Sequence, residues 1–499
     1  MSSLVQSVDW LAVAPPTIAA VVGLVVLVAD LFLDARRKAL LGWVSVAGLA
    51  VAALMLLPLL DGDRATFCLS GDPHLCSYTA DRFTLVIQFL VLGGALLAAL
   101  LSVTALEDAK RRIPEGEFWF LLLSSAAGAA LLPASRDLAT LVVALEVASL
   151  PAFALVGLRY GDKRSSEAAL KFFLSSVTAT AVSLMGISFV YASTGSLYLT
   201  QIADRIQHVD GQLHVLAQTG VVLTLVGFAF KTAAVPFHFW VPDTYVGAPL
   251  PVAAYLSVVG KAVGFSGLIL VTVVALPSYS AVWGPALAAL ACLTMTVGNV
   301  GALRQQATRA YSAVRLLAWS SVGQAGYLLV PIAAAGYSKD AQKAIGSTVA
   351  YALMYAAVNL GAFAVAALVG RTRTLNRITD YRGLYASNPL AALFLAFFLL
   401  CLAGLPPGII GLFAKVTVFS AAVDAGLGWL AVVMAVNVVI ALFYYLQWTA
   451  LLFRAPDGEP EKDRVPAPLT AAIALTAVLG VALSGAPQLV LRFSDTGLF

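Results

Sequence analysis

The chain has 499 residues, of which 61% are hydrophobic and only 11% are charged. That composition excludes a soluble globular protein, which needs far more polar surface, and it indicates a polytopic membrane protein. The formal charge of +4 at pH 7 is spread over many short loops instead of one face, so we expect no nucleic-acid partner.

The N-terminal segment has no basic region ahead of its first apolar run and no small-residue cleavage site, so we expect no cleaved targeting segment. Cys68 and Cys76 share a polar loop that the charge pattern below places outside the cytoplasm, where a disulfide between them is a hypothesis. Cys292 and Cys401 lie in apolar runs and are interpreted as core residues. The four cysteines form no CxxC pattern, which predicts no metal site.

Apolar runs of membrane-spanning length follow one another along the chain, and a bilayer needs about 20 such residues per helix. They lie near 15–33, 40–60, 83–105, 117–134, 138–158, 168–192, 216–242, 248–276, 280–302, 316–335, 345–370, 389–421, 427–453 and 467–491. We therefore predict an all-α polytopic membrane protein with about fourteen transmembrane helices.

The connectors between these runs alternate in basic charge. Nineteen of the 30 Lys and Arg residues fall on alternate connectors, seven fall on the others, and four lie within the runs. Cytoplasmic loops carry the excess of basic residues, so this pattern predicts that the N-terminus is outside. In the outer connector 193–215, mixed apolar and polar residues at helical spacing predict a short interfacial helix.

Glu146 stands in a run of spanning length that contains no other ionisable residue and carries a proline at position 151. Burial disfavours the charged form of a carboxyl or amino group, and an opposite charge nearby restores it. A Glu/Lys pair in a low-dielectric channel is therefore a proton-transfer element that switches when one partner moves.

The four lysines within the runs are the candidate partners. Lys171 lies about a turn from the expected cytoplasmic interface, where it can either snorkel or sit on a proton-entry path. Lys231 falls near the middle of its run, five residues before Pro236, which breaks or kinks the helix. Lys261 comes about 13 residues, or roughly 20 Å, into the next run. A charged residue near the middle of a membrane costs about 2.5–3.5 kcal/mol to insert, and a cost of this size indicates that the residue has a function.

Lys415 follows a second interruption, made by Gly404, Pro406, Pro407, Gly408 and Gly411. Two lysines beside broken helices in separate halves of the chain are the trace that inverted-repeat transporters leave in sequence. A structural ion pair between Glu146 and one lysine remains an alternative. It cannot neutralise three deep lysines, however, and uncompensated intramembrane lysines mark ion or proton pathways.

The segment 231–265, KTAAVPFHFWVPDTYVGAPLPVAAYLSVVGKAVGF, with LEVASLPAF before it and RLLAWSSVGQAGYLLV after it, resembles the antiporter-like membrane subunits of respiratory complex I. The form PFHxWxPDxYxGAP and the lysine of the twelfth helix are similar to the N group of these subunits in bacterial NADH-quinone oxidoreductase. The resemblance covers nearly the whole chain.

The resemblance implies two inverted five-helix repeats with helices 7 and 12 broken, within a single membrane domain. The implied segments are 1–115 for helices 1–3, 116–276 and 280–453 for the repeats, and 467–491 for helix 14. It also implies proton translocation driven by quinone reduction in other subunits. Glu146 is then similar to the glutamate that modulates a pumping lysine, Lys231 to that lysine, Lys261 to a connecting lysine and Lys415 to an exit-side lysine, while Lys171 resembles a sixth-helix lysine. In the family pattern a glycine directly precedes the exit-side lysine, whereas Phe413 and Ala414 do so here.

No nucleotide, haem or cysteine-cluster motif occurs, so we expect no cofactor in this chain. The resemblance places FMN, iron–sulfur clusters and quinone in partner subunits, and it names the antiporter-like subunit M, small membrane subunits and lipids as neighbours in a bacterial plasma membrane. Two alternatives remain open: a subunit of a multisubunit cation/proton antiporter or membrane-bound hydrogenase, and a structural membrane subunit with an idle channel.

Overall fold

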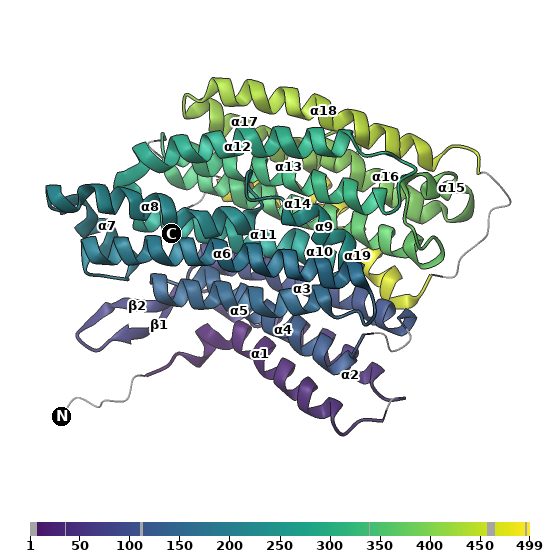
Figure 1. The fold of residues 1–499 in the computed structure, drawn as a ribbon, viewed down its shortest axis with the longest axis horizontal. Coiled ribbons are helices and arrows are strands. Elements are labelled where there is room, and N and C mark those ends of the chain that lie inside the picture. The colour runs from purple at the N-terminus through teal and green to yellow at the C-terminus, as the bar shows by residue number, and fades with distance from the viewer. Residues whose placement is uncertain (1–6, 35, 110–112, 339, 457–464, 495–496) are drawn as a thin grey trace.

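The computed structural model describes residues 7–34, 36–109, 113–338, 340–456, 465–494 and 497–499. Its long helices lie side by side, close to the long axis of the molecule (Figure 1). The basic residues that the sequence analysis counted at positions 110–112, 339, 462 and 464 lie outside the described residues.

The N-terminal part contains three long helices and a β-hairpin between the second and the third. Their bounds are α1 (Trp10–Asp30), α2 (Ala39–Leu54), β1 (Arg64–Leu69), β2 (Asp72–Ala80) and α3 (Arg82–Asp108). Asp9 caps α1 and Asp81 caps α3, each through its carboxylate and the first free N–H groups of the helix.

The next part contains the first interrupted helix. Its elements are α4 (Glu115–Leu131), α5 (Leu138–Gly157), α6 (Lys163–Thr194), α7 (Leu199–Arg205), α8 (Gly211–Thr232), α9 (Trp240–Gly247), α10 (Leu250–Tyr255) and α11 (Lys261–Ile269). Helix α5 continues through Pro151. Two π-helical segments, Leu256–Gly260 and Leu270–Ala275, flank α11. Helix α7 confirms the short helix expected in the 193–215 connector.

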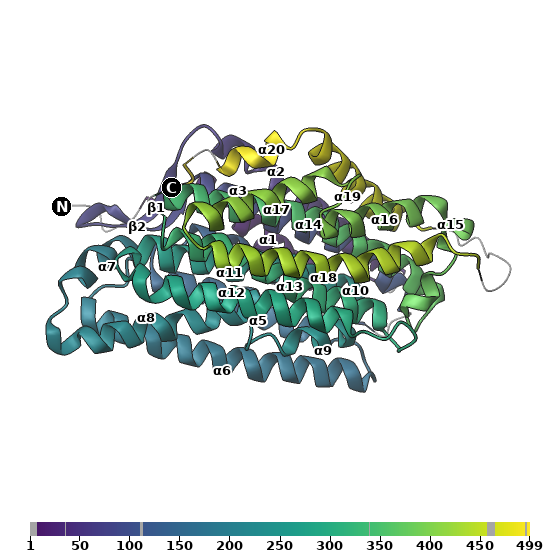
Figure 2. The same ribbon diagram turned by 90° about the horizontal axis from the view of Figure 1, so that it is seen from above.

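The last part contains the second interrupted helix. Its elements are α12 (Ser280–Leu303), α13 (Ser312–Ala335), α14 (Ala341–Thr372), α15 (Leu384–Ser387), α16 (Pro389–Ala403), α17 (Ile409–Asp424), α18 (Gly428–Leu452), α19 (Ala467–Gly485) and α20 (Gln488–Leu491). Figure 2 shows α6 at one edge of the molecule and α19 and α20 at the other. Among the described helices, α13 and α14 are the most enclosed membrane-length helices.

Thirteen helices in the described ranges are long and apolar enough to cross a membrane, and α16 with α17 makes a further interrupted crossing. This confirms the expected fold class and count of about fourteen. Helix α13 begins at Ser312, four residues before the apolar run expected at 316–335, so its first turn includes Arg315. The division into two five-helix repeats stays a prediction.

The two sets of connectors lie at opposite ends of the bundle. At one end, Arg371 pairs with Asp108 at 2.6 Å and Arg164 lies 4.5 Å from the ring centroid of Tyr311. At the other end, the Phe83 N–H donates to the Leu498 carbonyl at 3.0 Å. The hairpin, α7 and the described start of the chain share this second end (Figure 1). The alternation that the charge pattern predicted is therefore present in the fold.

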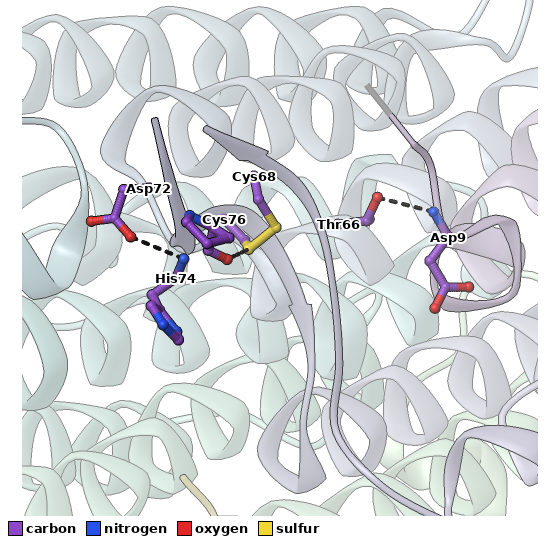
Figure 3. Close-up of a disulfide and its surroundings, with 7 residues drawn as sticks. Asp9, Thr66, Cys68, Asp72, His74 and Cys76 are labelled. Atoms are coloured by element: carbon purple, nitrogen blue, oxygen red, sulfur yellow. Dashed lines mark hydrogen bonds between the residues drawn. A yellow bond between two sulfur atoms is a disulfide. The ribbon is translucent and has the colours of Figure 1, made fainter. Parts of the chain in front are cut away.

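The hairpin places the two loop cysteines opposite each other, and Cys68 and Cys76 form a disulfide (Figure 3). The Asp9 N–H donates to the Thr66 hydroxyl at 3.1 Å, which ties β1 to the start of α1. The disulfide hypothesis is thus confirmed. Cys401 is a free, buried core residue as expected, whereas Cys292 is free but only partly buried against the core.

Helices α6 and α8 approach each other closely along small residues. The Gly227 N–H donates to the Ser183 hydroxyl at 2.7 Å, and that hydroxyl donates to the Thr224 carbonyl at 2.9 Å. A Cβ atom on Gly186 would lie 2.3 Å from the Thr224 backbone nitrogen. This contact fixes α8, and with it Lys231, against α6.

We expect peptide mapping of the unreduced chain, with free thiols alkylated first, to recover alkylated Cys292 and Cys401 and a crosslinked pair of Cys68 and Cys76. Reduction before alkylation converts the pair to two modified thiols. Alkylation of all four cysteines without reductant would contradict the assignment.

Replacing Gly186 by alanine is expected to destabilise the α6–α8 contact by about 1–3 kcal/mol, because the added methyl group meets backbone that cannot move aside. Gly93→Ala is the matched control: it lies inside α3, and its Cβ would meet nothing within 4 Å. The measurement is the midpoint temperature of thermal unfolding of the detergent-solubilised protein. An equal effect of both changes would show that the contact is not tight.

Candidate functional site

The first interrupted helix ends directly after Lys231. Ala233 adopts the left-handed conformation at φ 67°, and the Ala234 N–H donates to the Ala229 carbonyl at 2.9 Å, which is the Schellman ending of a helix. Lys231 lies in the last turn of α8, where the negative end of the helix dipole favours a cation. The break predicted beside this lysine is confirmed.

Lys231 is 5% exposed and is held by neutral groups. Its Nζ donates to the Ser176 hydroxyl at 2.9 Å. Three aromatic rings surround the same nitrogen, with centroids at 5.0 Å for Phe153, 5.3 Å for Phe172 and 5.6 Å for Phe230. Such rings attract an ammonium group through their negative faces.

Glu146 is half-buried on α5, and its Oε1 accepts a hydrogen bond from the Thr180 hydroxyl at 2.8 Å. In the part of the chain that the structure describes, no ion pair joins Glu146 to Lys231. The structure therefore brings these two residues to adjacent turns of α6 without direct pairing.

A small cavity of about 20 Å³ lies beside Lys231. Its lining is mostly apolar but also includes Ser125, Ser149, Tyr255 and Gly260, and a space of this size is large enough for one water molecule. Because Gly260 directly precedes Lys261, the cavity extends from the first lysine to the helix that carries the second.

Lys261 follows one π-helical segment and is 2% exposed. Its Nζ has no hydrogen-bond partner among the described residues, and the same holds for Asn359 Oδ1 and Tyr245 Oη. π-segments are concentrated at functional sites because they interrupt regular backbone pairing. Lys261 is a deeply buried amine without a partner carboxylate in the described ranges.

Lys415 is 3% exposed, and its side chain reaches back across the second break. Its Nζ donates to the carbonyls of Leu402 at 2.8 Å and Ala403 at 2.7 Å, the last residues of α16. Gly404 is left-handed at φ 86°, and the Leu405 N–H donates to the Leu400 carbonyl at 2.9 Å, a second Schellman ending. Lys231 lies before its break, in the last turn of the first half-helix, whereas Lys415 lies after its break, on α17, and bonds the last carbonyls of the first half-helix.

A set of neutral buried groups lies between Lys261 and Lys415. Near Lys261, the Ser257 hydroxyl accepts from Asn359 Nδ2 at 2.7 Å, and the Ser257 carbonyl accepts from the Tyr355 hydroxyl at 3.1 Å. The Tyr355 hydroxyl also bonds the Ser321 hydroxyl at 2.8 Å. These contacts join α14 and α13 to the π-segment before Lys261.

The same set continues from Ser320 toward Lys415. The Ser320 and Tyr445 hydroxyls are hydrogen-bonded, and Gln324 Nε2 donates to the Tyr445 hydroxyl at 3.2 Å and to the Leu402 carbonyl at 3.5 Å. Gln324 Oε1 accepts from the Tyr351 hydroxyl. Gln324 and Lys415 thus share the Leu402 carbonyl.

Lys171 lies apart from this buried line. Its side chain is 48% exposed and pairs with Glu167 at 2.7 Å and Asp243 at 3.0 Å, while Arg315 lies 3.6 Å from the same aspartate. This network lies at the end of the bundle that carries the basic connectors. The structure brings Glu146 close to the surroundings of Lys231 and leaves Lys171 at the surface.

The sequence analysis did not identify Ser176, Thr180, Gln324 or the tyrosines as site residues. Hydroxyl side chains occur in most of the apolar runs, so the presence of one does not indicate a site residue. Gln324 and Asn359 were better candidates, because each is the only amide side chain of its run and a lone amide in a membrane helix needs a partner.

Comparison with known proteins assigns this arrangement to a family. The family described as NADH:quinone oxidoreductase/Mrp antiporter, TM, matches residues 135–441. The NADH-quinone oxidoreductase subunit N 2 of Streptomyces griseus is 74% identical over all of this chain and 95% of its own length.

Solved structures agree. A chain of respiratory complex I from Thermus thermophilus with bound aureothin superimposes with a TM-score of 0.76 at 31% identity, covering 96% of this chain and 98% of that one. A chain of the Mrp complex from Dietzia has a TM-score of 0.82 at 21% identity, covering 97% and 96%, which shows the shared fold alone. The chain belongs to the NADH:quinone oxidoreductase/Mrp antiporter family and is similar over its whole length to bacterial subunits N.

Proposed function

We propose that the chain is the N-type, proton-translocating membrane subunit of a bacterial NADH-quinone oxidoreductase, in which Lys231, Lys261 and Lys415 exchange protons in turn. The observation that carries this proposal is the burial of all three lysines, each at most 5% exposed, with neutral partners or none among the described residues. Amines kept in low-dielectric surroundings without a fixed counter-ion change protonation readily.

The order of the proposed steps follows the contacts. Protons enter from the cytoplasm to Lys231, cross the small cavity toward Lys261, and pass along the hydroxyl and amide groups around Gln324 to Lys415, from which they leave on the outer side. Glu146 modulates Lys231 by approaching or leaving it. Lys171, in its exposed network with Asp243, would stand at the entrance.

The surroundings follow from the same proposal. The end that carries the basic connectors faces the cytoplasm of a bacterial plasma membrane, and the hairpin with its disulfide faces outward. Subunit M and small membrane subunits flank the chain, together with membrane lipids. NADH oxidation at FMN, electron transfer through iron–sulfur clusters and quinone reduction take place in partner subunits.

A second candidate function is cation/proton exchange in a multisubunit antiporter, favoured by the close fold similarity to the Mrp chain. The two functions separate by copurification with flavin-containing and iron–sulfur subunits and by NADH-driven activity.

Replacing Lys231 by alanine tests the function directly. We expect the complex to assemble, while NADH-driven acidification of inverted membrane vesicles and coupled NADH oxidation fall at least about tenfold, the scale of losing one proton-transfer group. Lys343→Ala is the control, since Lys343 is an exposed lysine paired with Asp424 at 3.2 Å. Normal acidification and turnover in the assembled Lys231 variant would favour a structural subunit with an idle channel.

Replacing Gln324 by leucine tests the segment between Lys261 and Lys415. The change removes the amide that joins the Tyr351 and Tyr445 hydroxyls to the Leu402 carbonyl, so we expect fewer protons moved per NADH oxidised. It also costs stability, about 1–3 kcal/mol for each buried group left without a partner.

Gln88→Leu is the matched control for Gln324→Leu. Gln88 is equally buried and also donates to a tyrosine hydroxyl, that of Tyr78 at 3.1 Å, and to a carbonyl, that of Ala130 at 2.8 Å. It lies between α3 and α4, away from the lysines. A similar loss of stability with an unchanged proton yield for both variants would remove Gln324 from the route.

A further inference from the structure

Helix α6 carries buried hydroxyl side chains on one face. Ser176, Thr180 and Ser183 are spaced by four and three residues, so they occupy neighbouring turns of the same face. All three are at most 8% exposed. Ser183 bonds the backbone of α8 at two points, which holds the two helices in a fixed register.

The other two hydroxyls, those of Ser176 and Thr180, contact Lys231 and Glu146. Ser176 accepts from Lys231 Nζ at 2.9 Å, and Thr180 donates to Glu146 Oε1 at 2.8 Å. Ser176 and Thr180 are separated by about 6 Å along the axis of α6, slightly more than one turn. Glu146 and Lys231 are therefore each bound to α6 and not to each other.

This arrangement makes direct pairing of Glu146 and Lys231 conditional. The carboxylate and the ammonium group form no ion pair in the positions that these hydroxyls hold, so at least one of the two side chains must move relative to α6 before they can meet. The aromatic rings around Lys231 hold the ammonium group meanwhile, so the separated state is not an uncompensated one.

We propose that Ser176 and Thr180 are positioning residues that hold Lys231 and Glu146 apart and thereby set how readily the pair forms during proton transfer. The proposal deepens the proposed function and rests on it, because the pair matters only if Lys231 carries protons. Neither hydroxyl takes the proton itself; each keeps an ionisable group in place until its partner moves.

Other ionisable groups on the packed elements do not replace this pair. The charged groups of α6 and α9 lie toward the surface, and the buried ionisable groups nearby are the Tyr245 hydroxyl of α9 and the amine of α11; the charged groups are Lys163, Arg164, Glu167, Lys171 and Asp243, and the amine is Lys261. In the described ranges, Glu146 is thus the carboxylate that α6 holds near Lys231.

The chain offers controls on the same helix. Ser175 and Thr178 lie on its exposed side, and their hydroxyls bond carbonyls of α6 itself, at 2.6 Å to Lys171 and 2.8 Å to Leu174. Ser175→Ala is therefore the control for Ser176→Ala, and Thr178→Val is the control for Thr180→Val. Each control removes the same hydroxyl group from α6, but at a position that contacts neither Lys231 nor Glu146.

The experiment measures NADH-driven acidification and coupled turnover of the assembled complex in inverted vesicles across pH 6–9. We expect Thr180→Val and Ser176→Ala each to shift the pH profile by about one unit, the effect of losing one hydrogen bond to a charged group. Thr180→Ser, which keeps the hydroxyl, and both exposed controls should superimpose on the native profile. Thr180→Ala replaces the valine variant if valine prevents assembly.

A second comparison shows whether Thr180 acts through Glu146. In a Glu146→Gln background, Thr180→Val should add nothing to the profile, because its partner charge is already gone. An additive shift in this background would overturn the positioning role of Thr180.

The outcomes separate the two proposals. Native profiles for Thr180→Val and Ser176→Ala, together with collapse of pumping in Lys231→Ala, would overturn the positioning role and leave the proposed function standing. Normal pumping by Lys231→Ala would overturn the proposed function and the positioning role with it.

Discussion

The structure depends on how an interrupted helix is tolerated inside a membrane. Each break frees backbone carbonyls that no lipid can bond, so protein groups must satisfy them. Both first half-helices end in a Schellman turn with a left-handed residue, Ala233 or Gly404. A lysine serves each end: Lys231 lies in the last turn of α8, and Lys415 of α17 bonds the last carbonyls of α16. A cation at a helix C-terminus is favourable, so the break stabilises the lysine and the lysine stabilises the break.

This mutual dependence explains why the lysines need no permanent carboxylate. Lys415 is bonded to the carbonyls of Leu402 and Ala403, and Lys231 to the Ser176 hydroxyl inside three aromatic rings. A fixed ion pair would hold each charge too firmly for exchange, since separating a buried pair costs several kcal/mol. Dipoles and rings attract the ammonium group less strongly, and they leave its proton removable. The hydroxyl and amide groups between Lys261 and Lys415 are likewise neutral, so they too can bond an ammonium group without pairing with it permanently.

Much of this architecture could be predicted from residues with an unmistakable signature. Runs of apolar residues give the helices, Pro236 and Pro406 give the breaks, and the scarcity of charge makes each buried lysine visible. The hydrogen-bond partners could not be predicted. Ser176 and Thr180 look like Ser175 and Thr178 in sequence, and only the packing of α5, α6 and α8 decides which pair faces inward. The reach of Lys415 back to α16 depends on the path of the chain through Gly404–Gly408, which local spacing does not specify.

The site also divides into a rigid part and a part open to its neighbours. Ser183 and the close contact at Gly186 fix α8 against α6, so Lys231 cannot shift without them. Glu146 belongs to α5, where Val143 and Leu150, one turn to either side of it, are at least half exposed. Among the described ionisable residues around Lys231, Glu146 is the one that combines a buried hydrogen bond, to Thr180, with exposed neighbours on its own helix. A neighbouring subunit that packs on this face of α5 would therefore lie beside the Glu146–Thr180 contact, while Lys231 stays enclosed.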